Sequence, residues 1–303
     1  MEKSYKSEIY RSKEGRHILH CLYRKHLMAM RVPISERMVE TCFGDTHIVF
    51  YGNPQGIPVL FFCGENALNP LSIRPFTRGL DLEKICLTVP DLPGQTGFSS
   101  ERKLSFPKGE YGEWACQVMD ALELATVSVM GYSFGGSIAL QLCKKALLRI
   151  ERLMLVLPAG IVNTSVSKIN KLLLPAIKRH KELTSDEIRV ALSPILSFEQ
   201  DELIEAAKLI MMHSSIETKG IDPLSKTAIH KFRSPVFVVA EKFDHLFPGD
   251  EVIRQARKII PHVAGTRLLM SGCHLGLFKE TDDNVAECYR AITDFILQTT
   301  IEG

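Results

Sequence analysis

Residues 131–136 read Gly-Tyr-Ser-Phe-Gly-Gly and place Ser133 in a setting where a hydroxyl group can do chemistry. They follow an apolar run of strand length, Val127–Met130, and precede a run with helical spacing, Ser137–Leu148. A serine on a sharp turn from strand to helix is exposed at the edge of a sheet, as a nucleophile must be. The setting predicts that Ser133 attacks a carbonyl group.

The residues beside this serine favour the same interpretation. The turn brings backbone segments together, so side chains at Gly131 and Gly135 would clash. It also points the backbone N–H of Phe134 toward the carbonyl that is attacked, as an oxyanion donor. A glycine-rich turn that only packs tightly is the alternative. A Walker phosphate loop is excluded because no Gly-Lys-Ser/Thr follows. A dinucleotide-binding fingerprint is excluded because the glycines have the wrong spacing.

A serine hydroxyl needs a base, and His274 is the best placed of the ten histidines. It lies in a glycine-flanked loop directly after the last expected strand, Arg267–Met270. The carboxyl ends of parallel strands share one edge of a sheet, so this loop should meet the turn at Ser133. His262 precedes the same strand and is expected at the opposite edge.

The imidazole in turn needs a carboxylate that fixes its tautomer. Asp244 follows another expected strand, Val236–Ala240, and should enter from the same edge. Glu241 lies close to the strand end and Asp250 lies beyond Pro248, so we interpret both as solvated. Asp244 is therefore the expected orienting acid.

A second oxyanion donor is expected from the loop that follows the first buried strand. Gly64 lets the chain turn back there, so that the backbone N–H of Glu65 faces the site beside that of Phe134. The side chain of Asn66 is a rival donor. Cys63 has no base beside it in the sequence, and we interpret it as a small packed residue.

The elements that must position these residues follow an α/β pattern. Apolar runs alternate with longer helical stretches such as Tyr111–Leu124, which predicts a doubly wound, mostly parallel sheet with helices on both faces. The apolar runs are Val59–Phe62, Ile85–Val89, Val127–Met130, Leu153–Leu157, Val236–Ala240 and Arg267–Met270.

Two further patterns lie upstream of this alternation. Residues 12–31 have the spacing of an amphipathic helix. Met38–Phe43 and His47–Tyr51 read as the strands of a hairpin around Gly44-Asp45.

Three parts of the chain are expected. They are an N-terminal helical extension at 1–35, a core domain formed by 36–159 and 226–303, and a helical cap inserted at 160–225. About 75 residues separate the two strands that flank the insertion, which is too long for a simple connection. The insertion contains helical patterns at Ile169–Ile177, Ile188–Leu192 and Leu203–Met212. Extra helices that only cover the core are the alternative to a cap.

Composition limits the partners of the protein. A net charge of +2 over 303 residues gives no field that would attract nucleic acid, so a small-molecule substrate is expected. The eight scattered cysteines and a polar start favour the cytoplasm, and no apolar run reaches the length of a membrane span. No metal or organic cofactor is expected. The oligomeric state is left open between monomer and homodimer.

Residues 37–298 resemble the α/β-hydrolase superfamily, specifically its small bacterial capped members that are similar to carboxylesterases. The resemblance rests on Asp-Leu-Pro-Gly-Gln-Thr-Gly-Phe-Ser at 91–99, the turn at Ser133, Phe-Asp-His-Leu-Phe-Pro around Asp244 and Gly-Cys-His at His274. The order serine, aspartate, histidine also matches. Many relatives carry His-Gly where this chain has Cys-Gly. The resemblance implies the α/β-hydrolase fold and a Ser-His-Asp triad.

The expected reaction is acyl transfer to water, with Ser133 as nucleophile, His274 as base and Asp244 as its orienting acid. Apolar side chains of the insertion, among them Leu172, Ile210 and Met211, suggest a mainly apolar ester substrate, unless they pack within the cap itself. The same triad also serves lactones, thioesters, carbon–carbon bonds and amides. A receptor that binds a ligand without turnover is the alternative from another class.

Overall fold

The computed structural model describes residues 7–162, 182–196, 200–215, 221, 223, 225, 229–270, 272–279 and 282–298. Within them lies an eight-stranded sheet in the order β1-β2-β4-β3-β5-β6-β7-β8. The strands are β1 Ile34–Thr41, β2 Gly44–Gly52, β3 Ile57–Phe62, β4 Ile85–Pro90, β5 Val127–Tyr132, β6 Ile150–Val156, β7 Val236–Glu241 and β8 Val263–Leu269. β2 pairs antiparallel with β1 and β4, and all other neighbours are parallel. This confirms the expected mostly parallel sheet.

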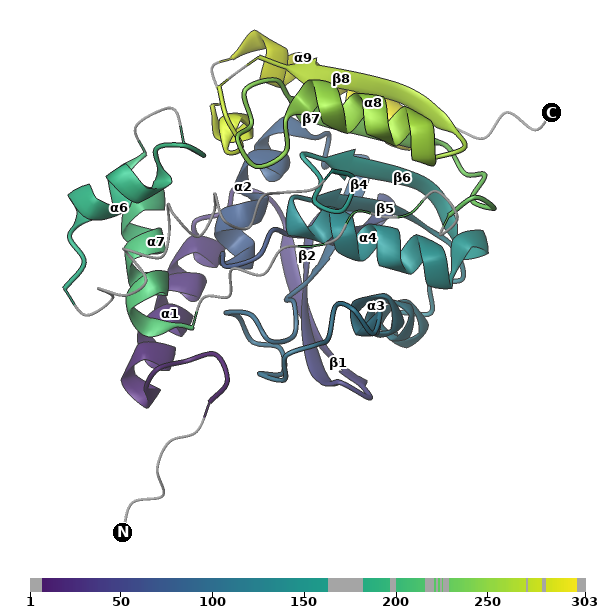
Figure 1. Ribbon diagram of the computed structural model, residues 1–303. Coiled ribbons are helices and arrows are strands. Elements are labelled where there is room, and N and C mark those ends of the chain that lie inside the picture. Colours follow the sequence, from purple (N-terminus) through teal and green to yellow (C-terminus); the bar gives the residue numbers. More distant parts are fainter. Residues whose placement is uncertain are drawn as a thin grey trace.

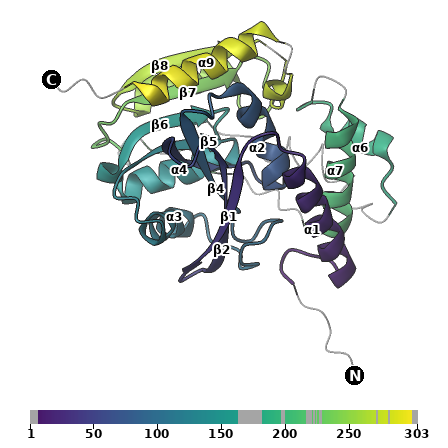
Figure 2. The same cartoon turned by 180° about the vertical axis from the view of Figure 1, so that it is seen from behind.

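Helices cover both faces of the sheet (Figures 1 and 2). One face carries α3 (Glu110–Ala121), α4 (Phe134–Lys145) and α8 (Gly249–Ile259), and the other carries α2 (Asn69–Gly79) and α9 (Asp283–Leu297). The helices α1 (Lys13–Met28), α6 (Ser185–Leu192) and α7 (Asp201–His213) form a group beside the sheet. Short 3-10 helices are η1 (Leu147–Arg149) and η3 (Gly276–Phe278).

Strand β3 shows why the apolar runs were continuous rather than alternating. Val59 and Phe61 join the hydrophobic cluster under α2 and α9, whereas Leu60 and Phe62 join the cluster under α3, α4 and α8. All four side chains are fully buried. A strand with helices on both sides must be apolar at every position.

Strand β8 begins at Val263, four residues before the expected Arg267. Most of its residues are exposed or half-buried, because it pairs on one side only and forms an edge of the sheet. An edge strand with a solvated face carries no apolar run, so its first half could not be recognised.

The hairpin is present, but its turn differs from the expectation. Thr41 pairs with Gly44, so the two turn residues are Cys42 and Phe43 rather than Gly44-Asp45. Phe43 is buried in the cluster that also holds Trp114. Placing Phe43 in the turn buries its ring, and Gly44 accommodates a φ of 102° at the start of β2.

Helix α1 packs against α2 and α7. Its Leu19, Tyr23 and Leu27 are buried in the same hydrophobic cluster as β3 and α2. Two expected helices of the insertion are confirmed as α6 and α7, while the third, Ile169–Ile177, lies outside the described residues.

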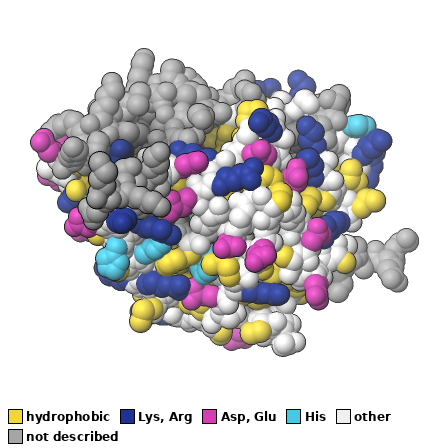
Figure 3. Space-filling view, turned by 90° about the horizontal axis from the view of Figure 1, so that it is seen from below, with side chains coloured by type: hydrophobic (Ala, Val, Ile, Leu, Met, Phe, Trp, Pro, Cys, Tyr) yellow, Lys and Arg dark blue, Asp and Glu magenta, His cyan; other side chains and the backbone are white. Residues whose placement is uncertain are grey.

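Charges of both signs are mixed on the face seen in Figure 3, where Lys and Arg side chains alternate with Asp and Glu. Among the helices that the structure describes, none combines the length and the apolar character that crossing a membrane requires.

Candidate active site

Ser133 occupies the single residue between the end of β5 and the start of α4. Its φ of 54° and ψ of −120° are strained for a residue with a side chain, and the positive φ agrees with the sharp turn expected there. The strain is held by backbone hydrogen bonds. Ser133 N–H donates to the carbonyl of Val156 at 3.0 Å, and its carbonyl accepts from Gly136 and Ala159, each at 2.9 Å. The turn therefore presents the hydroxyl at the carboxyl edge of the sheet.

The two glycines around Ser133 are required by close backbone contacts. A Cβ atom at Gly131 would lie 2.5 Å from the carbonyl oxygen of Gly135. A Cβ atom at Gly135 would collide with the carbonyl oxygen of Phe62, at the end of β3. Gly131 therefore allows the close approach of α4 to β5, and Gly135 allows the close approach of α4 to β3.

The structure brings the three expected side chains into one chain of hydrogen bonds. His274 Nε2 lies 2.8 Å from Ser133 Oγ, and His274 Nδ1 lies 2.6 Å from Asp244 Oδ2. The second carboxylate oxygen, Oδ1, accepts the N–H groups of Leu246 at 2.7 Å and Phe247 at 3.1 Å. Because Asp244 and His274 are 2% and 4% exposed, their hydrogen bond is shielded from water.

Two aromatic rings hold the imidazole in place. Tyr132 stacks on His274 at a centroid distance of 6.0 Å, and Phe247 contacts it edge-on at 5.5 Å. Burial raises the pKa of Tyr132, so its hydroxyl keeps the proton that it donates to the backbone carbonyl of His274. The ring of His274 thus has little freedom besides the orientation that joins serine and aspartate.

The two expected oxyanion donors come from segments that meet at Ser133. Phe134 is the first residue of α4, where backbone N–H groups have no acceptor within the helix and the helix dipole favours negative charge. A Cβ atom at Gly64 would lie 3.5 Å from Ser133 Cβ and 3.8 Å from its Oγ, so the loop that carries Glu65 passes beside the serine. Asn66, whose side chain is the alternative donor, has a φ of 55°, and its backbone N–H donates to Gln95 Oε1 at 3.0 Å.

The other residues weighed for the site differ in how deeply they are buried. Cys63 is buried, and burial raises the pKa of its thiol, in agreement with a packed side chain. His262 precedes β8, as expected, and Asp250 is exposed. The interpretation of Glu241 as solvated was wrong. It is fully buried, because β7 lies between β6 and β8 and α8 covers its end.

A buried acid–histidine cluster was missed by the sequence reasoning. Asp91 accepts from the hydroxyl of Tyr23 at 2.9 Å and lies 2.9 Å from His47 Nδ1, while His47 Nε2 lies 2.7 Å from Glu36. Burial disfavours the charged imidazole, but the hydrogen bonds and charges of Asp91 and Glu36 outweigh it and raise the pKa of His47. The available signal was Asp91 itself, a carboxylate directly after a buried strand.

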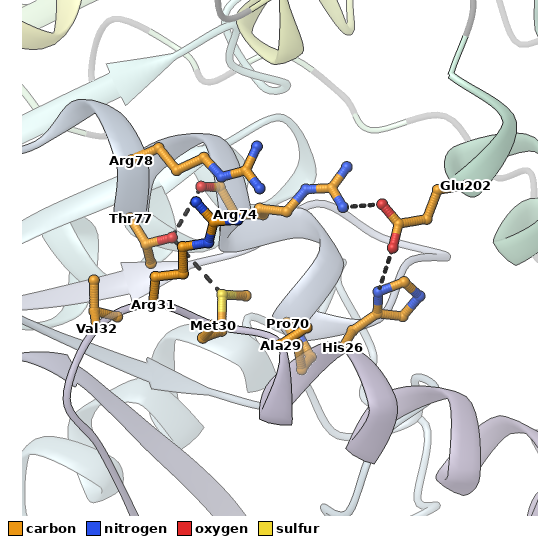
Figure 4. Close-up of a pocket in the computed structure, with 10 residues that line it drawn as sticks. All are labelled: His26, Ala29, Met30, Arg31, Val32, Pro70, Arg74, Thr77, Arg78 and Glu202. Carbon is orange, nitrogen blue, oxygen red and sulfur yellow. Dashed lines mark hydrogen bonds and ion pairs between the residues drawn. The ribbon is translucent and has the colours of Figure 1, made fainter.

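A separate cavity of about 240 Å³ opens between α1, α2 and α7 (Figure 4). Glu202 bridges Arg74 and His26 across it. Its lining residues are His26, Ala29, Met30, Arg31, Val32, Pro70, Arg74, Thr77, Arg78 and Glu202, and none of the Ser-His-Asp residues is among them. In the described part of the chain, no group of three or more His, Cys, Asp or Glu could hold a metal ion.

The insertion's contribution to the site is only partly described. Ile210 and Met211 are buried in a hydrophobic cluster that also contains residues of α1 and α2, so they pack inside the protein and not within the insertion alone. Leu172 lies outside the described residues.

Comparison with known proteins gives three findings. A family model for the alpha/beta hydrolase fold matches residues 57–194. Poly(3-hydroxyalkanoate) depolymerase from Ectopseudomonas oleovorans is 30% identical over 215 residues, which cover 65% of this chain and 71% of that protein. Two solved structures from Bacillus subtilis share the fold. The naproxen esterase has a TM-score of 0.79 and 15% identity, and carboxylesterase CesB has 0.76 and 16%. Each alignment covers 94% of this chain and 99% of the other.

Proposed function

This chain belongs to the α/β-hydrolase family, and we propose that it is a serine hydrolase that cleaves small, mainly apolar carboxylic esters. The observation that carries the proposal is the position of His274, which lies within hydrogen-bond distance of both Ser133 and Asp244. A nucleophile, a base and a buried orienting carboxylate are the three groups that acyl transfer to water requires.

The proposed first half-reaction forms an acyl-enzyme. Ser133 Oγ bonds to the ester carbonyl carbon while its proton passes to His274 Nε2. Asp244 stabilises the imidazolium that results. The carbonyl oxygen becomes an oxyanion between the N–H groups of Phe134 and Glu65. The C–O bond of the leaving group then breaks, and the departing alkoxide takes the proton from His274.

The second half-reaction reverses these roles with water. His274 removes a proton from a water molecule whose oxygen attacks the acyl carbon. The oxyanion forms again, and its collapse breaks the bond to Ser133 Oγ, which recovers the proton from His274. The product is a carboxylic acid, and the residues return to their starting protonation. Besides the ester and the water molecule, this proposed cycle uses the chain's own residues.

The relative's name narrows the substrates worth testing first. A poly(3-hydroxyalkanoate) depolymerase acts on a polyester of hydroxy acids, so short oligoesters of 3-hydroxyalkanoic acids belong beside simple esters in the test set. The helical cap at 160–225, with α6 and α7 as its described helices, is proposed to cover this acyl site. Lactones, thioesters and amides are the bond types against which the ester preference is measured.

The decisive experiment treats the protein with a fluorophosphonate and follows release of p-nitrophenol from p-nitrophenyl butyrate. We expect labelling at Ser133 and an initial burst of about one equivalent, both abolished in Ser133→Ala. Ser137→Ala is the matched control, because Ser137 is a buried serine one turn further along α4. Absence of labelling and of turnover in the native protein would favour a receptor that binds without cleaving.

A further inference from the structure

The loop that carries the second oxyanion donor is fixed by a neighbouring loop. We call residues 63–68 the oxyanion loop and residues 91–99 the bracing loop. Asn66 N–H donates to Gln95 Oε1 at 3.0 Å, and the hydroxyl of Thr96 donates to the carbonyl of Ala67 at 3.3 Å. Asn66 follows Glu65 directly and has a φ of 55°, so its hydrogen bond holds a strained peptide next to the proposed donor.

The bracing loop is in turn held by the N-terminal segment, residues 7–28. The hydroxyl of Tyr10 donates to the carbonyl of Gly97 at 3.0 Å and accepts its N–H at 3.2 Å. The hydroxyl of Tyr23 donates to Asp91, and His20 packs its ring on Phe98 at a centroid distance of 4.3 Å. Burial raises the pKa of Tyr10 to about 12, so this hydroxyl remains a donor at neutral pH.

The same segment is joined to helix α7 of the insertion. Arg11 N–H donates to the carbonyl of His213 at 3.0 Å, and Ser215 N–H donates to the carbonyl of Ile9 at 2.7 Å. Tyr10 thus forms a short antiparallel bridge with Ser214 through its backbone while its hydroxyl holds Gly97. One continuous set of hydrogen bonds runs from α7 through the N-terminal segment to the bracing loop and the oxyanion loop.

We propose that Gln95 is a positioning residue for the oxyanion loop, and that the N-terminal segment acts on the reaction by holding the bracing loop from which Gln95 reaches. This inference rests on the proposed function, because it concerns the donor at Glu65. Displacing a donor by a fraction of an ångström weakens its hydrogen bond to the oxyanion more than its contact with the neutral substrate. Loss of Gln95 should therefore lower kcat and leave KM nearly unchanged.

The test compares Gln95→Met with Gln117→Met. Gln117 is the matched control, since its Oε1 also accepts a backbone N–H, that of Cys42 at 2.8 Å, in a half-buried position at the hairpin. For p-nitrophenyl butyrate we expect kcat of Gln95→Met to fall by about 10- to 100-fold, less than the 10²- to 10³-fold typical of deleting a donor. KM should change by less than about threefold, and Gln117→Met should keep kcat within about twofold.

A second measurement separates positioning from general loosening. A butaneboronic acid forms a tetrahedral adduct with an active-site serine and places an oxygen in the oxyanion hole. Its affinity should fall in proportion to kcat in Gln95→Met, and to a smaller extent in Tyr10→Phe, which removes the two hydrogen bonds between Tyr10 and Gly97. Equal behaviour of Gln95→Met and Gln117→Met would overturn the inference. A native protein that neither binds the boronate nor cleaves esters would instead overturn the proposed function.

Discussion

Asp244 and His274 meet at 2.6 Å with both side chains buried, and the second oxygen of the same carboxylate accepts hydrogen bonds from two backbone N–H groups. The backbone therefore fixes the carboxylate, and the carboxylate fixes which imidazole nitrogen carries the proton. An amide at position 244 would still fit the space. An amide has one oxygen and one NH₂ group, so its NH₂ group would face either His274 or the two backbone N–H donors, where an acceptor is needed.

We therefore expect Asp244→Asn to fold and to lose roughly 10³- to 10⁴-fold in kcat, the size of effect that a wrong histidine tautomer causes in such triads. Esterase assays over pH 6–9 and circular dichroism measure the two properties. Asp250→Asn is the control, because Asp250 is exposed on α8. A fully active Asp244→Asn protein would transfer the orienting role to another carboxylate, and Glu241→Gln would be tested next.

Alanine substitutions at Gly135 and Gly64, two glycines close to Ser133, should affect different properties of the protein. In Gly135→Ala the new methyl group would collide with the carbonyl oxygen of Phe62, so we expect loss of folding. In Gly64→Ala the methyl group would make an ordinary contact 3.5 Å from Ser133 Cβ, so we expect a folded protein with lowered activity. Thermal unfolding followed by ester hydrolysis distinguishes them. A stable Gly135→Ala protein would contradict the described approach of α4 to β3.

The buried cluster around His47 should make stability depend on pH. The pKa of His47 is raised in the folded protein. The contribution of His47 to the free energy of unfolding is therefore complete below its pKa in the unfolded chain, about 6.5, and is lost as pH rises through its pKa in the folded protein. Native protein and His47→Gln should therefore differ most near pH 6 and converge at higher pH. Urea unfolding at several pH values measures this difference. His17→Gln, at an exposed position, should show no such convergence.

The only tryptophan of the chain reports on a buried hydrogen bond. Trp114 is fully buried, and its ring N–H donates to Thr46 Oγ1 at 2.9 Å. Thr46→Val leaves this donor without an acceptor and should cost about 1–3 kcal/mol of stability. Thr46→Ser, which keeps the hydroxyl, should cost less. Denaturation followed by tryptophan fluorescence measures both, and equal losses would assign the effect to packing rather than to the hydrogen bond.

The sequence predicted the parts of the protein that depend on local signals. The glycines that the turn at Ser133 requires lie within six residues of sequence, and the apolar runs of the central strands are buried by the helices on both faces of the sheet. The rule that parallel strands end at one edge then brought Asp244 and His274 to the serine. These steps needed no knowledge of side-chain packing.

Other features depend on contacts that no local pattern contains. Tyr23 meets Asp91 across 68 residues, and Tyr10 meets Gly97 across 87. The burial of Glu241 follows from its position at the end of β7, between two strands and under α8, although glutamate side chains are usually exposed. The N-terminal helix had an amphipathic pattern, but the pattern could not say which surface its apolar side would cover.

The bridge between Tyr10 and Ser214 also has a consequence for how the protein is made. The two backbone segments that this bridge joins are about 200 residues apart in the chain. During synthesis the segment around Tyr10 leaves the ribosome about 200 residues before the end of α7, with which it pairs. Contacts between such distant residues close late because of the entropy of the intervening loop. Helix α1 is therefore synthesised well before the surface of α7 against which it packs in the folded protein.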